Sequence, residues 1–216
     1  MAEIKFCGLT RAEDAAYAAE LGATYTGVIF AGGPRMLTIE RAAGVFAGVP
    51  RRVKRVGVFA DQTAAEIAAT AIHLGLDVVQ LHGAFDCARI DELRARFDGD
   101  VWSVCRIAGS ALPGEFALMA QASNAVLLDA FVPGALGGTG VTVPWADIGR
   151  EIDSLSMTTA IVLAGGLRPE NVASAIAQLA PAVVDVSSGV ESAPGIKDHD
   201  RMRAFRDAVS HSGIST

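Results

Sequence analysis

The chain has 216 residues, and its 18 Lys and Arg against 24 Asp and Glu give a formal net charge of −6. Hydrophobic residues make up 51% and charged residues 19%, which excludes the composition of a disordered chain. An acidic balance without a run of Lys and Arg argues against a nucleic-acid partner. The longest uncharged apolar runs, such as residues 160–167, are far shorter than the roughly 20 residues that span a bilayer, so no membrane partner is expected.

The N-terminal residues lack a long apolar segment and therefore do not resemble a secretory signal. Cys7, Cys87 and Cys105 are too widely spaced to indicate a disulfide framework or a metal-ligand cluster. We therefore expect a cytoplasmic protein.

Short β-branched runs alternate with Ala-rich segments of helical periodicity along the whole chain. The expected strands are residues 4–7, 25–30, 53–59, 77–81, 101–107, 124–129, 159–164 and 183–187. The expected helices are residues 13–21, 39–46, 63–74, 88–97, 114–120, 143–152, 169–179 and 198–209, with Pro169 at a first helical position.

Eight β-then-α units without a break in composition predict an α/β fold, a single (β/α)8 TIM barrel that occupies residues 1–216 as one domain. An open doubly wound sheet fits less well because it usually has fewer strands. The longest connection, residues 130–143, is rich in glycine, and we expect it to close over a ligand.

Active sites of such barrels lie at the carboxyl ends of the strands, where Cys7, His82 and Asp129 stand in this sequence. Cys7 is a candidate catalytic residue, although a lone cysteine is more often a small buried hydrophobe. Asp129 follows four apolar residues, where a carboxylate is costly unless partnered; it is either functional or a loop-organising residue. His82 is either a site residue or a structural, hydrogen-bonded histidine.

Glycine and serine follow the last two expected strands, at Gly165 and Gly166 and at Ser187, Ser188 and Gly189. Backbone N–H groups in such turns can converge on an anion, and this pair of loops frequently holds a phosphate in TIM barrels. We therefore expect these residues to bind a phosphate rather than to form ordinary turns.

Two charged side chains complete the candidate site. Arg35 follows Gly32, Gly33 and Pro34 and either forms a surface ion pair or directs its guanidinium at a substrate carboxylate. Lys5 has the same strand parity as Cys7, so it should face the barrel interior, where Asp185 of the neighbouring last strand is its expected partner.

The motifs at the strand ends resemble those of the phosphoribosylanthranilate isomerase family of tryptophan biosynthesis, and they occur in the order of that family. They are Lys5-Phe-Cys-Gly-Leu-Thr10, the segment 30–35 with its Pro-Arg ending, Val58-Phe-Ala-Asp61, Gln80-Leu-His-Gly83, Leu128-Asp129, Gly137-Gly-Thr-Gly140, the segment 163–171 and Val184-Asp-Val-Ser-Ser-Gly-Val-Glu191.

The resemblance implies an Amadori rearrangement of N-(5-phosphoribosyl)anthranilate by general acid/base catalysis. It implies Cys7 as the base, Asp129 as the acid and Arg35 as the ligand of the anthranilate carboxylate. His82 and the glycine and serine loops would bind the remainder of this small-molecule phosphosugar. No metal or organic cofactor is implied, and we expect a monomer or a homodimer.

These roles require an aspartic acid that keeps its proton and a cysteine that loses one. We expect burial to raise the pKa of Asp129 and cationic neighbours to lower the pKa of Cys7. The alternatives are another phosphosugar barrel, such as an indole-glycerol-phosphate synthase or histidine-pathway isomerase relative, and a non-catalytic barrel that binds a phosphate ligand. The cysteine after the first strand favours the anthranilate isomerase over those enzymes.

Overall fold

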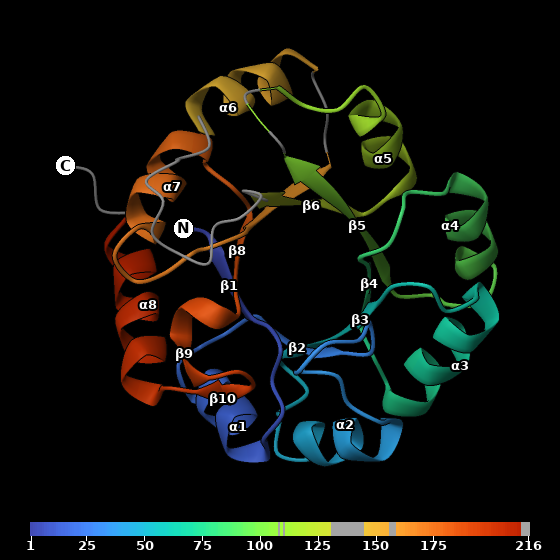
Figure 1. Ribbon diagram of the computed structural model, residues 1–216, viewed down its shortest axis with the longest axis vertical. Coiled ribbons are helices and arrows are strands. Elements are labelled where there is room, and N and C mark those ends of the chain that lie inside the picture. The colour runs from blue at the N-terminus through green and yellow to red at the C-terminus, as the bar shows by residue number, and fades with distance from the viewer. Residues whose placement is uncertain (108, 110, 131–144, 156–158, 213–216) are drawn as a thin grey trace.

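The computed structural model describes residues 1–107, 109, 111–130, 145–155 and 159–212. Eight parallel strands form a closed barrel in chain order, and the helices surround it (Figure 1), as the sequence predicts. The strands are β1 (Glu3–Phe6), β2 (Tyr25–Ile29), β3 (Lys54–Phe59), β4 (Val78–Leu81), β5 (Asp100–Ile107), β6 (Ala125–Ala130), β7 (Ala160–Ala164) and β8 (Val183–Val186).

The helices agree closely with the sequence prediction. They are α1 (Ala12–Glu20), α2 (Ile39–Phe46), α3 (Ala64–Leu74), α4 (Cys87–Arg94), α5 (Phe116–Ala122), α6 (Trp145–Ser154), α7 (Val172–Leu179) and α8 (His199–His211). No described helix is both long and apolar enough to cross a membrane.

The start of α7 differs from the prediction, because Pro169 lies outside the helix and Asn171 is the residue before its first turn. The Asn171 side chain accepts a hydrogen bond from the N–H of Arg168 and donates one to the carbonyl of Gly166. These bonds hold residues 166–171 as a turn and delay the helix to Val172.

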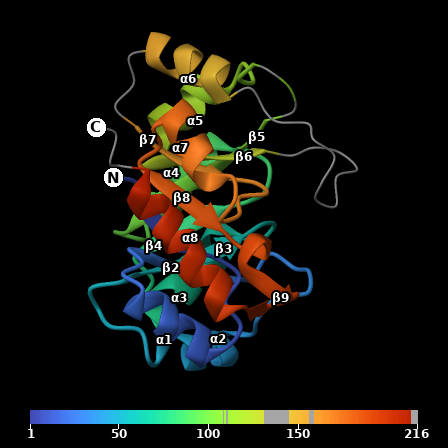
Figure 2. The same cartoon turned by 90° about the vertical axis from the view of Figure 1, so that its left-hand side faces the viewer.

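Two short strands and one helical turn after β8 are absent from the prediction: η1 (Ser188–Val190), β9 (Glu191–Ala193) and β10 (Ile196–Lys197). β9 and β10 pair antiparallel and lie close to α1 and α8, at the end of the barrel toward which the β8 arrow points (Figures 1 and 2). Elements of three and two residues are too short to show a periodicity in the sequence.

The core has two parts, as expected for strands that are buried on both faces. One group of apolar side chains packs between the strands and the surrounding helices. A second group, including Tyr25, Val56, Trp102, Leu127 and Val162, fills the barrel interior. This filled interior places the cavity described below at one end of the barrel.

Candidate active site

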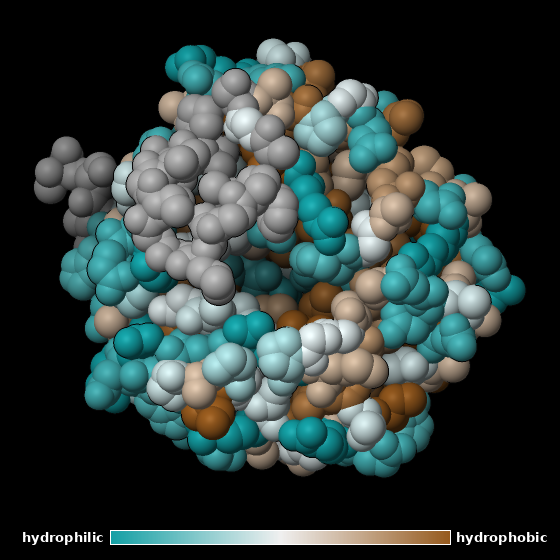
Figure 3. Space-filling view, viewed as in Figure 1, coloured by the Kyte–Doolittle hydropathy of each residue, from teal (hydrophilic) through white to brown (hydrophobic). Residues whose placement is uncertain are grey.

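A cavity of about 550 Å³ opens at the carboxyl ends of the strands, and Figure 3 shows the hollow at the centre of this face. All of the predicted site residues except Arg35 line it. These residues are Cys7, His82, Asp129, Gly165, Gly166, Ser187, Ser188 and Gly189. The cavity thus brings together residues that lie up to 182 positions apart in the sequence, from Cys7 to Gly189. They lie at or just after the ends of β1, β4, β6, β7 and β8.

Cys7 follows β1 directly and is 5% exposed. Its Sγ lies near the Lys5 ammonium: a Cβ at Gly27 of the adjacent strand would stand 3.2 Å from Sγ and 3.4 Å from Nζ. Lys5 donates a hydrogen bond to Asp185 Oδ2 at 3.0 Å, and β1 pairs with β8 so that Lys5 is opposite Asp185. The predicted buried ion pair is therefore confirmed.

The expected lowering of the Cys7 pKa is wrong. Burial raises the pKa of the thiol above its ordinary value of 9.0, and Lys5, which lowers it, does not compensate. The Asp185 carboxylate also raises the pKa of Cys7. Because Lys5 donates a hydrogen bond to Asp185, its positive charge is shared between Asp185 and Cys7. Cys7 is therefore a thiol at neutral pH when the cavity holds no ligand.

Asp129 behaves as expected. Burial raises the pKa of its carboxyl group above the ordinary 3.8, although His82 and Arg106 act in the opposite direction. Burial in turn lowers the pKa of His82, which favours the neutral imidazole. His82 Nδ1 is buried and has no hydrogen-bond partner among the described residues. A neutral imidazole with an unused nitrogen at the cavity wall can bind a polar ligand group.

The two glycine-containing loops meet at the side of the cavity formed by β7 and β8. Gly165 and Gly166 have positive φ angles of 85° and 66°, and their N–H groups find no acceptor among the described residues. A Cβ at Gly189 would stand 1.9 Å from the carbonyl oxygen of Leu167, so the two loops touch there. Ser187 Oγ is buried and has no partner in the described part of the chain. Free donors on two touching loops suit a phosphate.

Arg35 reaches the site from the loop after β2 but does not line the cavity. Its Nε and Nη2 donate to the two carboxylate oxygens of Glu191, at 2.8 and 2.6 Å. Its aliphatic part lies against Gly8, where a Cβ would stand 2.6 Å from Arg35 Cδ. Gly8 has a φ of 67°, and so a glycine is needed there both for the backbone and for the Arg35 side chain.

Two buried charged residues near the cavity, Glu191 and Lys197, are missing from the sequence prediction. Glu191 ends the last of the motifs that carry the family resemblance, and this motif was the one signal for it. Lys197 is a single lysine without a pattern, and nothing in the sequence around it indicates burial. Both lie on the unpredicted β9 and β10 strands.

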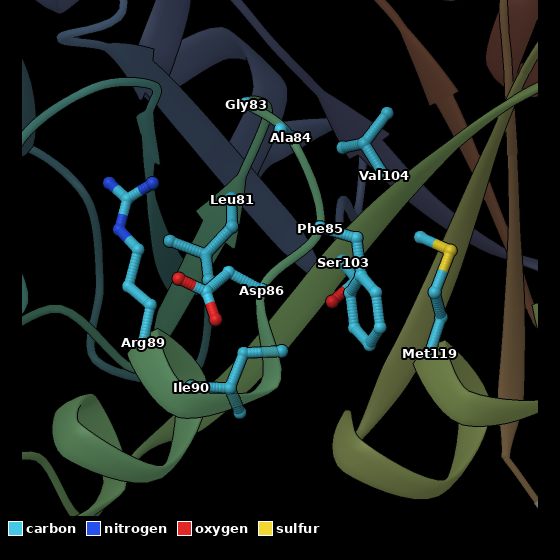
Figure 4. A pocket seen from close by; sticks show the side chains of 10 residues that line it. All are labelled: Leu81, Gly83, Ala84, Phe85, Asp86, Arg89, Ile90, Ser103, Val104 and Met119. Atoms are coloured by element: carbon cyan, nitrogen blue, oxygen red, sulfur yellow. The ribbon is translucent and has the colours of Figure 1, made fainter. Parts of the chain in front are cut away.

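A second cavity lies outside the barrel, where α4 and α5 cover β4 and β5 (Figure 4). Its volume is about 10 Å³, which holds about one water molecule. Leu81, Phe85, Ile90 and Met119 line it, with Arg89 at one side. The Arg89 guanidinium is used in hydrogen bonds to the carbonyls of Ala60 and Gln62. This cavity is a packing gap and not a substrate site.

Within the described ranges, no group of three or more His, Cys, Asp and Glu side chains is arranged to hold a metal ion. The segment 131–144, which contains most of the glycine-rich connection, lies outside the described residues.

The chain resembles known proteins over nearly its whole length. Residues 4–208 match the family model described as N-(5'phosphoribosyl)anthranilate (PRA) isomerase. A Chromohalobacter salexigens protein named N-(5'-phosphoribosyl)anthranilate isomerase is 42% identical over 215 residues, covering 97% of this chain and 94% of that protein. A protein of the same name from Pseudomonas savastanoi pv. phaseolicola is 38% identical over 214 residues, with 95% and 96% coverage.

Solved structures agree with this relationship. Phosphoribosyl anthranilate isomerase from Thermotoga maritima has a TM-score of 0.86 at 34% identity, covering 98% of this chain and 100% of that one. An isomerase structure in complex with reduced 1-(o-carboxyphenylamino)-1-deoxyribulose 5-phosphate has a TM-score of 0.82 at 31% identity, with 98% and 100% coverage. The chain belongs to the N-(5'-phosphoribosyl)anthranilate isomerase family.

Proposed function

We propose that this chain performs the reaction of its family, in tryptophan biosynthesis, with Cys7 as general base and Asp129 as general acid. The reaction converts N-(5-phosphoribosyl)anthranilate to 1-(2-carboxyphenylamino)-1-deoxyribulose 5-phosphate. The observation that carries the residue assignment is one cavity lined by a buried thiol, a carboxyl group with a raised pKa and two loops whose N–H donors find no acceptor among the described residues. We further propose that residues 1–216 act as one domain.

The chemistry begins at the furanose ring. Asp129 donates its proton to the ring oxygen, the bond from that oxygen to C1 breaks, and the anilino nitrogen forms a protonated Schiff base with C1. The Cys7 thiolate then removes the proton on C2, and the C–H electron pair forms the enolamine. Tautomerisation of the enolamine gives the ketone. Each proton transfer needs a group held against the reacting atom, which the cavity supplies on two sides.

The raised pKa of Cys7 determines how much enzyme is active. The productive form has a protonated Asp129 and a Cys7 thiolate. When Asp129 has the lower pKa of the two groups, most of the enzyme has instead an Asp129 carboxylate and a Cys7 thiol, and the productive form is the minor one. Lys5 stabilises this form because its ammonium group lowers the pKa of Cys7. Lys5 itself stays protonated: burial lowers its pKa, but Asp185 and Cys7 together outweigh burial and raise the pKa overall.

Binding groups hold both ends of the substrate. The loops with Gly165, Gly166, Ser187, Ser188 and Gly189 bind the phosphate through their donors. Arg35 binds the anthranilate carboxylate, and His82 binds a polar group of the sugar between the two ends. With both ends fixed, the reacting carbons lie between Cys7 and Asp129, and this positioning supplies much of the catalysis.

The partner is a small-molecule phosphosugar, and the assembly is proposed to be a monomer or a homodimer. One similar structure consists of monomers generated from the dimeric isomerase of Thermotoga maritima. The location is proposed to be the cytoplasm, where free cysteines such as Cys7, Cys87 and Cys105 remain reduced.

A fluorescence assay with freshly generated phosphoribosylanthranilate tests the assignment. The anthranilate emission decays as the substrate is converted. Cys7→Ala and Asp129→Asn should each lower kcat by about 10²- to 10⁴-fold, which is the usual contribution of a general acid or base. Cys87→Ser, at an exposed position on α4, is the matched control and should leave the rate unchanged. Full activity of either site variant contradicts the assignment, and a purified wild-type protein that binds the substrate without decay indicates a non-catalytic barrel.

A further inference from the structure

Two buried charged side chains beside the active site have no part in the proton transfers above. Glu191 begins β9 and Lys197 ends β10, and their side chains are 5% and 0% exposed. Removing charged groups from water is costly, and a buried ion pair is often no more stabilising than well-packed apolar residues of the same size. A buried charged cluster at the mouth of the barrel therefore calls for a functional explanation.

The contact between Glu191 and Arg35 leaves part of the guanidinium unused. A guanidinium has five N–H donors in a planar fork, and Glu191 occupies one edge of it through Nε and Nη2. The second N–H of Nη2 and the adjacent N–H of Nη1 form a second edge. That edge makes no hydrogen bond within the described residues, and its geometry suits a second carboxylate.

Lys197 also contacts the Glu191 carboxylate. Its Nζ donates to Glu191 Oε1 at 2.9 Å and to the carbonyl oxygen of Ser187 at 3.0 Å. Glu191 contacts two cationic side chains, so a protonated Lys197 leaves the cluster with a net positive charge that attracts an anion, although burial lowers the pKa of Lys197. Lys197 also links the Arg35–Glu191 pair to Ser187, which belongs to the loop assigned to the phosphate.

The backbone of β9 and β10, which carry Glu191 and Lys197, is also held by hydrogen bonds. The N–H of Lys197 donates to Asp14 of α1 at 3.2 Å, and Arg201 of α8 donates to the Glu191 carbonyl at 2.7 Å. Burial alone raises the pKa of Glu191, but the hydrogen bonds from Arg35 and Lys197 outweigh it, and the pKa is lowered overall. Glu191 is therefore ionised at neutral pH, as its contact with both cations requires.

We propose that Glu191 and Lys197 are positioning residues for the substrate carboxylate. Glu191 fixes the guanidinium of Arg35 so that its unused edge receives the carboxylate. Lys197 holds Glu191 and the Ser187 carbonyl at once, and it thereby sets the separation between the carboxylate-binding and phosphate-binding groups. This inference rests on the proposed role of Arg35 and extends it to two residues that do not touch the substrate.

Two substrates separate positioning from general stability. One is phosphoribosylanthranilate, and the other is the N-(5-phosphoribosyl) derivative of aniline, which lacks the carboxylate and is followed by chromatography. Glu191→Gln should lower kcat/KM for the anthranilate substrate about tenfold or more, mainly through KM, because a charge-assisted contact is lost. For the aniline substrate it should change kcat/KM by less than about twofold, since no carboxylate is bound.

Lys197→Met should show the same selectivity for the anthranilate substrate. It should also weaken competitive inhibition by inorganic phosphate severalfold, because the Ser187 carbonyl loses its support. Glu66→Gln, at the exposed start of α3, is the matched control and should leave both substrates unaffected. Glu191→Asp keeps the charge and shortens the reach, and it provides a milder variant if Glu191→Gln fails to fold.

Arg35→Gln distinguishes the two levels of the proposal. Suppose that Arg35→Gln lowers kcat/KM only for the anthranilate substrate, while the Glu191 variants lower kcat/KM for both substrates equally or for neither. The positioning role of Glu191 is then wrong, and the role of Arg35 stands. If Arg35→Gln lowers kcat/KM equally for both substrates, Arg35 does not bind the carboxylate, and the positioning role of Glu191 and Lys197 is wrong as well. A decrease in kcat/KM for the anthranilate substrate alone, in the variants at Arg35, Glu191 and Lys197, supports the proposal.

Discussion

Lys5 and Asp185 form an ion pair of 3.0 Å inside the barrel, between strands that begin and end the closed sheet. Their side chains are 0% and 8% exposed, so neither charge has much access to water. The pair lies next to Cys7 and places two opposite charges among the apolar side chains that fill the barrel interior.

Lys5→Met should lower the free energy of unfolding by about 3 kcal/mol, because it leaves Asp185 with a buried, unpaired charge. Combining it with Asp185→Asn should restore part of the loss. Urea unfolding measures both values. Lys54→Met removes an exposed pair with Asp100 at 3.8 Å and should cost less than about 1 kcal/mol. Equal losses for the buried and exposed lysines would contradict the interpretation.

The contribution of Lys5 to stability should depend on pH in one direction. Its pKa in the folded protein is raised above the ordinary 10.5, because Asp185 and Cys7 together outweigh the lowering by burial. The contribution is therefore complete below pH 10.5 and is lost as the pH rises through the folded pKa. The difference in unfolding free energy between wild type and Lys5→Met, measured on both sides of pH 10.5, should shrink on the alkaline side. A difference that grows on the alkaline side would contradict the raised pKa of Lys5.

The pH profile of kcat/KM should be flat in the middle and fall at both ends. The acidic break reports the raised pKa of Asp129 and lies above the ordinary 3.8, while the alkaline break reports the raised pKa of Cys7 and lies above 9.0. These breaks belong to the pair, since the two groups work together. Steady-state rates over the full range locate both.

Arg106 offers a way to move only the acidic break. It lies one residue before the end of β5, opposite Asp129 of β6, and lowers the pKa of that carboxyl group. Arg106→Gln should therefore raise the acidic break and leave the alkaline break in place. Arg96→Gln, which removes an exposed contact to Glu92, serves as the control. An unchanged acidic break in Arg106→Gln would remove the proposed link between Asp129 and the profile.

Gly189→Ala should weaken phosphate binding. The added Cβ would stand 1.9 Å from the Leu167 carbonyl oxygen, which forces the β7 and β8 loops apart. We expect inhibition by inorganic phosphate to weaken about tenfold, equivalent to about 1.4 kcal/mol. Gly44→Ala adds a methyl group to an exposed position on α2 with no atom within 4 Å, and it should leave the inhibition constant unchanged. Tight phosphate inhibition in Gly189→Ala would argue against these loops as the phosphate site.

The local sequence pattern by itself determined much of this protein. Short β-branched runs and segments of helical periodicity located the eight barrel strands and the eight described helices, whereas the short β9 and β10 strands carry no such pattern. Strand parity also placed Lys5 and Cys7 on one face, and barrel closure then made Asp185 the partner of Lys5. Glycines at the ends of β7 and β8 indicated the two loops that meet at the cavity.

Only the tertiary structure decided the contact between Arg35 and Glu191 and the local dielectric around Cys7. Arg35 and Glu191 are 156 positions apart, and no local pattern reports that they meet. The Cys7 pKa depends on a balance between burial and the Lys5 charge, and burial outweighs the cation. The sequence specifies which groups are present, whereas desolvation depends on how every surrounding segment packs around them.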